Sequence, residues 1–372
     1  MKILSTLVGF KCLGDSCEDT CCIGQHVQLE KEFVDRFQSD ARVSAKLKNL
    51  TKDGRGGYLS KISGCPFLST DRLCQIQRQH GHSSLPRGCQ DYPRKEIFFD
   101  GEQHKIALLS CPEIVELGIL RDNVLDFQSD DTKSDSSQKY PSTPFYQSLG
   151  IVQKLMLSII QKTESPYLGL YRLSVFAKKL KKEIESDMLT LNQQRIFSVY
   201  KELNHIQMPL KDQEQGSIFL CTLLMSVLKK ATLRDQSLHQ AVSSIHSPEQ
   251  FIASFKHKEE LLHSRFVSLQ GFWMERYIRY NILTTSFFSP FTSTETNDIE
   301  EYTEAIFIKL LTIRMLLYFL PTSDEACFRS AIKKAIYLTH RVFDHSTSVL
   351  QRIMQEYRKS KIDSELLYTI QL

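Results

Sequence analysis

The last two thirds of this 372-residue chain contain little cysteine, and no part of it carries a long apolar run or an excess of one charge. The most apolar stretch, around 306–320, is interrupted by Lys309 and Arg314 and falls short of the roughly 18 residues that a membrane-spanning helix needs. The net charge of +4 is spread along the sequence, so there is no basic arm to neutralise phosphates. These absences predict a soluble protein that binds neither membranes nor nucleic acid.

The opening stretch, MKILSTLVGF, has a lysine and a short apolar run, but no small-residue cleavage site follows before Lys11 and Cys12. We therefore expect no signal peptide and a cytoplasmic location. A reducing compartment keeps cysteines as thiols and thiolates for metal or redox work, whereas secreted chains pair them as disulfides. A chain of this length with 41% hydrophobic residues also needs no disulfides to build a core.

Cysteine is concentrated at one end of the chain, in the segment before residue 112. Zinc and iron-sulfur clusters both accept four thiolates, and no C-x2-C pair of the kind typical of structural zinc is present. Cys65 and Cys111 each precede a proline, as the closing cysteine of bacterial ferredoxin motifs does. The pattern favours an iron-sulfur cluster, with zinc as the alternative. The candidate ligands are Cys17, Cys21, Cys22, Cys65, Cys74, Cys89 and Cys111.

The spacing of these cysteines restricts which of them can bind the same centre. Cys17 and Cys21 share one face if their loop is helical, whereas the adjacent Cys21 and Cys22 cannot both point the same way. One of that pair is therefore expected to bind the centre while the other packs inward or serves a second centre. A structural centre that takes no part in any reaction is the alternative for the whole set.

The chain divides into a small α+β domain and an all-helical domain, so the predicted fold is mainly α. Residues 1–125 form the cysteine-rich domain, 126–144 a linker rich in Ser and Asp, and 145–372 the helical domain. Asp100-Gly101 centres a predicted hairpin over 95–109 that brings Cys89 and Cys111 together. A short helix is expected from Asp71 to Gly81. Apolar periodicity predicts about eight later helices, at 145–162, 167–184, 215–231, 249–263, 268–283, 300–319, 324–340 and 346–358, with Cys221 and Cys327 in their core.

Several motifs of the cysteine-rich part resemble the flagellin lysine N-methylase family: FKCLGDSCEDTCCIGQHVQLE, GCPFL, RLCQIQRQHG, CQDYPR and LSCPEIVEL, in that order. The later ERYIRYNILTTSFFSPF (275–291) and RVFDH (341–345) are weaker matches. The resemblance implies a cytoplasmic enzyme that uses S-adenosylmethionine to methylate lysines of flagellin and carries a cysteine-bound iron-sulfur cluster, expected to be of the 4Fe-4S type. Gln25 departs from the family, which generally has tryptophan there.

Methyl transfer to lysine needs a neutral amine and a positioned donor. We expect Arg94 to bind a carboxylate, either that of the cofactor or that of Glu113, and Tyr92 to orient the amine. Arg341 and His345, four apart on a predicted helix with Asp344 beside them, are expected to form a second polar cluster facing the first domain, in which His345 is a candidate catalytic residue.

The donor has no obvious binding loop in this sequence. The segment DGRGGY (53–58) reads as a turn, so the donor would bind without a doubly wound α/β framework. An iron with an open position, held by only three cysteines, is an alternative way to chelate the methionyl group. A non-enzymatic zinc or iron-sulfur module for protein interaction or redox sensing is the alternative function.

Overall fold

A computed structural model describes residues 1–23, 26–47, 57–60, 64–129, 143–188, 190–207, 214–233, 235–285, 298–344 and 347–360. The expected catalytic His345, the departure at Gln25, most of the expected linker and most of the 53–58 turn lie outside these ranges. Within them the protein is mainly α-helical with a small α+β region at its N-terminal end, as predicted. No helix in the described part is long and apolar enough to cross a membrane.

The predicted hairpin is confirmed and belongs to a four-stranded sheet. The turn residues Asp100 and Gly101 have φ values of 52° and 76°, the left-handed pair that a tight two-residue hairpin turn requires. The strand order is β4-β5-β1-β6, with β1 parallel to β5 and antiparallel to β6. The strands are β1 (Lys2–Leu4), β4 (Arg94–Phe99), β5 (Glu102–Ala107) and β6 (Phe127–Ser129).

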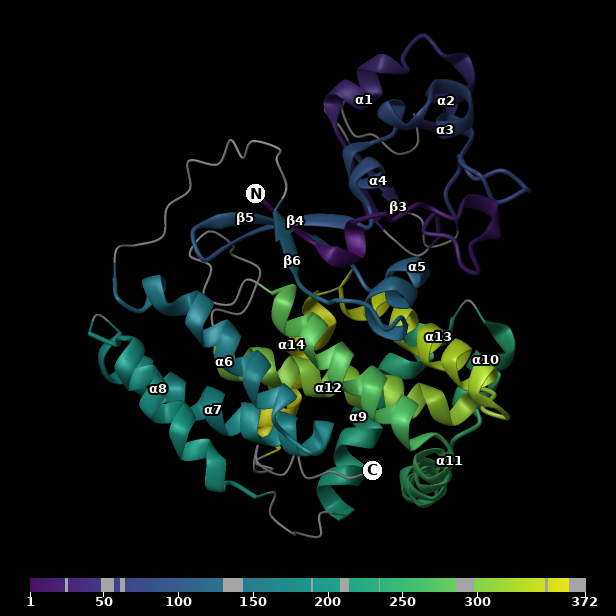
Figure 1. The fold of residues 1–372 in the computed structure, drawn as a ribbon. Helices are drawn as coiled ribbons and strands as arrows, with labels where there is room; N and C mark the ends of the chain where they lie inside the picture. Colours follow the sequence, from purple (N-terminus) through teal and green to yellow (C-terminus); the bar gives the residue numbers. More distant parts are fainter. Residues whose placement is uncertain are drawn as a thin grey trace.

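A separate small unit rises above the sheet (Figure 1). It contains the antiparallel pair β2 (His26–Leu29) and β3 (Gly57–Ser60) and the short helices α1 (Lys31–Arg36), α2 (Ala41–Leu47), α3 (Gln75–His80) and α4 (Arg87–Asp91). Its own hydrophobic core includes Phe33, Phe37, Phe67 and Ile76, with Cys65 buried among them. The helix expected to begin at Asp71 begins only at Gln75, because residues 68 and 74 form an isolated β-bridge and Arg72 has φ 63°.

The rest of the chain is a body of helices on which the sheet rests (Figure 1). The helices expected at 249–263 and 268–283 run on as one element, broken by non-helical angles at Phe266. Three short helices, α5, α8 and α10, were not predicted. The helices are α5 (Pro112–Val115), α6 (Leu149–Gln161), α7 (Pro166–Asp187), α8 (Gln193–Lys201), α9 (Glu214–Thr232), α10 (Gln236–Ser243), α11 (Pro248–Leu283), α12 (Ile299–Phe319), α13 (Glu325–Phe343) and α14 (Thr347–Lys359).

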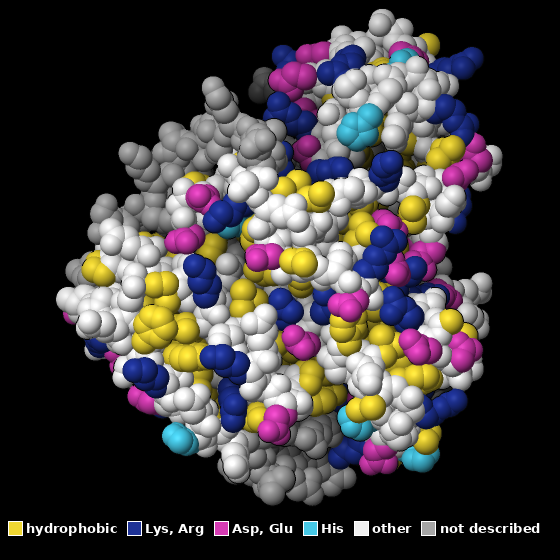
Figure 2. Space-filling model, in the orientation of Figure 1, with side chains coloured by type: hydrophobic (Ala, Val, Ile, Leu, Met, Phe, Trp, Pro, Cys, Tyr) yellow, Lys and Arg dark blue, Asp and Glu magenta, His cyan; other side chains and the backbone are white. Residues whose placement is uncertain are grey.

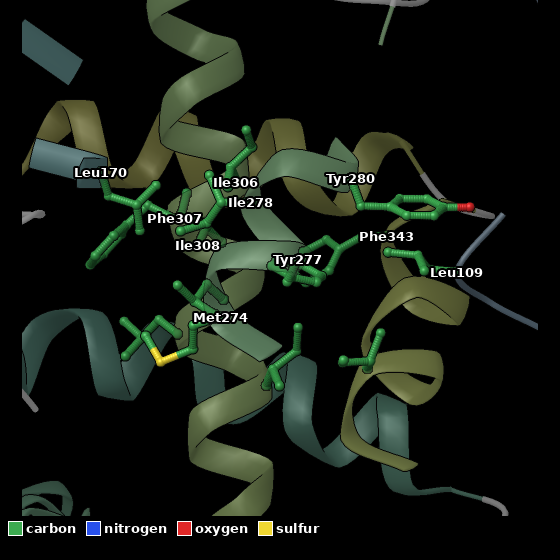
Figure 3. Packing of buried hydrophobic residues seen from close by; sticks show 14 of the residues in the cluster. Leu109, Leu170, Met274, Tyr277, Ile278, Tyr280, Ile306, Phe307, Ile308 and Phe343 are labelled. Atoms are coloured by element: carbon green, nitrogen blue, oxygen red, sulfur yellow. The ribbon is translucent and has the colours of Figure 1, made fainter. Parts of the chain in front are cut away.

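The large hydrophobic core joins the sheet to these helices. Leu4 and Phe99 from the sheet belong to the same buried cluster as Met274 and Ile308 from α11 and α12. Figure 3 shows Leu109, which follows β5, beside Tyr280 and Phe343 at one edge of this core. Cys221 is fully buried in it, as predicted, whereas Cys327 is half-buried on α13.

Side chains of both charge signs are interspersed over the face drawn in Figure 2. No surface of one sign dominates that face, in line with the low net charge of the sequence.

Candidate functional site

All eight N-terminal cysteines line one or both of two adjoining cavities, although they come from five separate stretches of the chain. The larger, here called the cysteine cavity, has a volume of about 250 Å³. The smaller, here called the inner cavity, has a volume of about 60 Å³. Cys21, Cys22, Cys74 and Cys89 line both cavities. Cys12, Cys17 and Cys111 line the cysteine cavity, and Cys65 lines the inner cavity.

Local structure explains how distant cysteines meet. Cys74 and Cys111 occupy the positions immediately before α3 and α5, where the backbone is extended. Cys89 lies within α4, which leads into β4, so Cys89 and Cys111 flank the open end of the hairpin. Strand pairing ends at Arg94 and Ala107, so the meeting of these two cysteines comes from the two flanking helices and not from a longer ladder.

The loop that carries the first four cysteines is not helical. Cys17 ends a single 3-10 turn and has extended backbone angles, so it shares no helical face with Cys21. Both side chains nevertheless reach the cysteine cavity. Cys21 and Cys22 each line both cavities, and Cys22 also packs against the small core.

The donor chemistry fits a thiolate-bound centre. Eight thiols surround two adjoining cavities, and four satisfy zinc or an iron-sulfur cluster. No three described Cys, His, Asp or Glu side chains converge closely enough to hold a metal ion as they stand. Burial raises the pKa of the Cys17 thiol and raises that of Cys111 to about 11. A centre would therefore displace thiol protons and draw its ligands together as it binds.

Tyr92, Arg94 and Glu113 all line the cysteine cavity. The Tyr92 hydroxyl donates to Ser110 Oγ at 3.3 Å, and burial raises its pKa, so it stays protonated at neutral pH. The Arg94 guanidinium lies 5.1 Å from the centre of the Phe10 ring. Burial also raises the pKa of the half-buried Glu113 carboxyl. Arg94 and Glu113 form no ion pair with each other within the described part of the chain, so the cofactor's carboxylate, the other expected partner of Arg94, stays a prediction.

Arg341 connects the helical body to the cysteine loop. Its guanidinium forms an ion pair with the Asp19 carboxylate and donates to the Asp19 carbonyl at 3.4 Å and to the Ser110 carbonyl at 3.2 Å. It lies 5.1 Å from the centre of the Tyr337 ring, is 9% exposed, and lines the cysteine cavity. Of the expected polar cluster, only Arg341 contacts the cysteine loop, through Asp19, while Asp344 lines a different cavity and His345 lies outside the described residues.

A third cavity, here called the hairpin cavity, lies between the β4–β5 hairpin and the helices α11 to α14 and has a volume of about 330 Å³. Lys309, Asp344 and His340 on its wall form a hydrogen-bonded series that ends at the fully buried Tyr277. Lys309 Nζ lies 3.1 Å from Asp344 Oδ1, Asp344 Oδ2 lies 2.8 Å from His340 Nδ1, and His340 Nε2 lies 3.0 Å from Tyr277 Oη. Burial lowers the pKa of His340, and the pKa of Asp344 is lowered by its two partners despite its burial.

The sequence analysis did not predict this hydrogen-bonded series of side chains. It paired Arg341 with His345, four residues apart, whereas the structure pairs His340 with Asp344, also four apart on the same helix. A shift of one residue turns a helical position by about 100° and so moves it to another face. The usable signal was a His-x3-Asp pair at the end of an otherwise apolar helix.

Comparison with known proteins now places the chain. A family model described as the FliB lysine N-methylase C-terminal domain matches residues 153–370, which is more than half of the sequence. The chain belongs to the lysine N-methylase family. The match includes α13 and all four members of the buried chain on the hairpin cavity.

Curated relatives of this lysine N-methylase family member agree with that placement. It is 27% identical over 191 residues to the lysine-N-methylases of Salmonella typhimurium and Salmonella choleraesuis, covering 46% of this chain and 46% of each relative. It is 29% identical over 115 residues to the flagellar biosynthetic protein FliU of Salmonella muenchen, covering 28% of this chain and 68% of FliU. The chain thus matches about half the length of the two lysine-N-methylases. No solved structure matches it.

Proposed function

We propose that this protein is an S-adenosylmethionine-dependent protein-lysine N-methyltransferase that acts on flagellin in the cytoplasm, with an iron-sulfur cluster, expected to be 4Fe-4S, held by its N-terminal cysteines. The observation that carries the proposal is the family match over the helical body, together with a cavity lined by cysteines, arginines and carboxyl groups of the first domain and by Arg341 of the helical body. Zinc is the alternative centre.

The cysteine cavity has the groups that a methionyl donor requires. Arg94 and Glu113 line it, and they are suited to bind the carboxylate and the ammonium group of the methionyl part. When bound, the donor supplies a sulfonium methyl group to a lysine nitrogen. Tyr92, which stays protonated, can accept a hydrogen bond from the incoming amine through its oxygen while donating to Ser110.

The lysine amine must lose its ammonium proton to solvent before it attacks, because only the free lone pair can form the new N–C bond. The C–S bond of the donor breaks as the N–C bond forms, and the sulfur keeps the electron pair. The residues proposed above therefore contribute by position, since the two reacting groups have to approach in line.

The first test asks whether the centre exists and of which kind. Anaerobically purified protein should be brown and should contain iron and acid-labile sulfide. Cys74→Ser should lose most of the bound iron, whereas Cys327→Ser should keep it, because Cys327 is also half-buried but lies outside both cysteine-lined cavities. Stoichiometric zinc without sulfide would replace the cluster in this proposal by the zinc alternative.

The second test asks for the reaction. Protein incubated with methyl-labelled S-adenosylmethionine and flagellin should transfer label to lysine residues, located by peptide mass spectrometry. Arg94→Met should lower the rate at limiting donor by at least about tenfold, the cost of one lost charge-assisted contact. A metal-loaded protein that transfers no methyl group to flagellin would favour a binding or redox-sensing module instead.

A further inference from the structure

Arg341 is the one side chain of the helical body that lines the cysteine cavity in the described part of the chain. We propose that Arg341 is a positioning residue for methyl transfer, which acts through Ser110 to place the Tyr92 hydroxyl where it meets the acceptor amine. This inference rests on the function proposed above and adds a residue to its mechanism. The observations that carry it are the hydrogen bonds of Arg341, its burial, and the two parts of the cavity that it joins.

Two hydrogen bonds lead from Arg341 to Tyr92. Arg341 Nε donates to the Ser110 carbonyl at 3.2 Å, and the Tyr92 hydroxyl donates to Ser110 Oγ at 3.3 Å. Ser110 is fully buried, so both contacts are shielded from solvent. A displacement of Ser110 would therefore move the hydrogen-bond partner of Tyr92.

The same guanidinium also holds the cysteine loop. It forms an ion pair with the Asp19 carboxylate and donates to the Asp19 carbonyl at 3.4 Å. The Cys17 thiol donates to that same carbonyl at 3.0 Å. Asp19, Cys17 and Tyr92 all line the cysteine cavity. Arg341 thus fixes the cysteine loop and the residue that holds Tyr92 relative to each other.

These contacts suit a guanidinium in particular. Its donors point in fixed directions from one plane, whereas a lysine ammonium is a compact point charge. The Tyr337 ring, four residues earlier on α13, lies 5.1 Å from the guanidinium and packs against it. Arg341 is 9% exposed, and apolar packing could join the two regions without the cost of burying a charge. What the guanidinium adds to such packing is direction.

Lys333 provides a matched comparison on the same helix. Its ammonium lies 3.1 Å from the carboxylate of Glu18, the residue next to Asp19, so it holds the same loop. The Lys333 side chain is 25% exposed, compared with 8% for that of Arg341, and it does not line the cysteine cavity. Lys333 is therefore expected to stabilise the loop without affecting Tyr92.

Methyl transfer depends steeply on position, because the amine and the sulfonium methyl group must approach in line. A displacement of about 1 Å can cost about a hundredfold in rate. The proposed donor contacts, at Arg94 and Glu113, are separate from the hydrogen bonds that join Arg341 to Tyr92. Loss of Arg341 should therefore lower kcat and leave the KM for the donor unchanged.

The kinetic test compares Arg341→Gln with Lys333→Gln at equal iron content. Arg341→Gln should lower kcat with flagellin at least about tenfold and change the KM for S-adenosylmethionine by less than about twofold. Lys333→Gln should keep both constants. Arg341→Lys keeps the charge beside Asp19, so it should fold as the unaltered protein does, but it should not restore kcat because it lacks the planar fork.

A double-mutant cycle asks whether Arg341 acts through Tyr92. Tyr92→Phe removes the hydroxyl and should itself lower kcat. When Arg341→Gln is added to Tyr92→Phe, kcat should fall by less than about twofold further. A second loss as large as that of Arg341→Gln alone would show that Arg341 does not act through Tyr92.

A further measurement does not depend on methyl transfer. In protein isotope-labelled at tyrosine Cζ, the NMR resonance that disappears in Tyr92→Phe belongs to Tyr92. Arg341→Gln and Arg341→Lys should both shift this resonance, because each disturbs the carbonyl contact at Ser110. Lys333→Gln should leave the resonance in place.

The outcomes separate this inference from the proposed function. If flagellin is methylated and the Arg341 variants lose kcat and shift the Tyr92 resonance, both stand. If the unaltered protein does not methylate flagellin but the resonance shifts, Arg341 positions Tyr92 and the methyltransferase proposal fails. If the Tyr92 resonance stays in place in both Arg341 variants, or if they keep the kcat of Lys333→Gln, Arg341 is a structural contact and not a positioning residue.

Discussion

The small unit and the helical body have separate hydrophobic cores that differ in composition. The small core draws its members from residues 27–85, buries Cys65 among them, and has Cys22, Cys74 and Cys89 packed against it. The large core joins the sheet to the helices through aromatic and aliphatic residues such as Trp273 and Phe328. The proposed metal ligands are thus part of one core and nearly absent from the other. The comparison leads us to expect that the small unit depends on the proposed centre, whereas the helical body is stable by packing.

Removing the proposed centre should have the largest effect on stability, and the loss should be confined to the small unit. A structural metal contributes on the order of 10 kcal/mol to the folding of a small domain. After chelation, limited proteolysis should cut within the described segments between residues 26 and 91, while the peptides of α6 to α13 stay protected. Hydrogen exchange by mass spectrometry measures both regions in one experiment, and equal loss of protection in both would contradict the comparison.

The opposite perturbation is Phe328→Ala, in the large core. Phe328 is fully buried and stacks on Phe266 at a ring distance of 5.0 Å, so its truncation should cost about 3–5 kcal/mol of unfolding free energy. Urea denaturation followed by circular dichroism reports the loss, and iron content should be unchanged. Phe197→Ala, at a position 41% exposed, is the control and should change stability by less than about 0.5 kcal/mol.

The pH dependence of stability caused by His104 shows whether the sheet unfolds with the small unit or with the helical body. It is 4% exposed, lies between the rings of Phe99 and Phe127, and neither ring nitrogen has a hydrogen-bond partner in the described part of the chain. Burial lowers its pKa to about 4, from 6.5. The unfolded chain therefore takes up a proton that the folded protein does not, and stability should fall by about 3 kcal/mol as the pH drops from 6.5 to 4.

The loss should appear in the unfolding of the helical body, since the sheet shares its core. His104→Phe should remove this contribution to the pH dependence of the urea midpoint, because phenylalanine has no proton to bind. His246→Gln, at an exposed position, should leave the dependence in place. An unaltered pH dependence in His104→Phe would assign the effect to other groups.

The smallest effect is expected at the contact between the two regions. Arg341→Gln leaves the Asp19 carboxylate and the Ser110 carbonyl without their partner, but Asp19 is 20% exposed and can be hydrated, so about 2 kcal/mol should be lost. The cysteine loop should then react faster with a thiol reagent in metal-free protein. Arg358→Gln, which removes a more exposed ion pair on α14, should leave that rate unchanged.

The elements that the sequence predicted well are those set by local rules. The Asp100-Gly101 turn needs two left-handed residues in succession, and few dipeptides supply them as readily. Long helices rich in apolar residues, such as α6 and α12, were predicted within a few residues of their observed bounds. The start of α3 was misplaced, because the bridge between Leu68 and Cys74 holds the chain extended up to Cys74.

The sequence predicted most of the residues that line the candidate site, but only some of the contacts between them. The seven proposed cysteine ligands, Tyr92, Arg94 and Glu113 were all named in advance and all line the two cysteine-lined cavities. The chain of Tyr277, His340, Asp344 and Lys309 was not, because its members come from three helices and become neighbours only when those helices pack. His345, named in advance as catalytic, stays a prediction.

By itself, the sequence determined that this protein has a cysteine-rich α+β region, a tight hairpin and a large helical body, because turn chemistry and apolar periodicity act over a few residues. Only the tertiary structure decided that β1 pairs with β5, that the hairpin rests on the helical core, and that one turn of α13 faces two cavities. Those contacts join residues more than 100 positions apart. Their formation depends on the packing of whole surfaces, which no local pattern records.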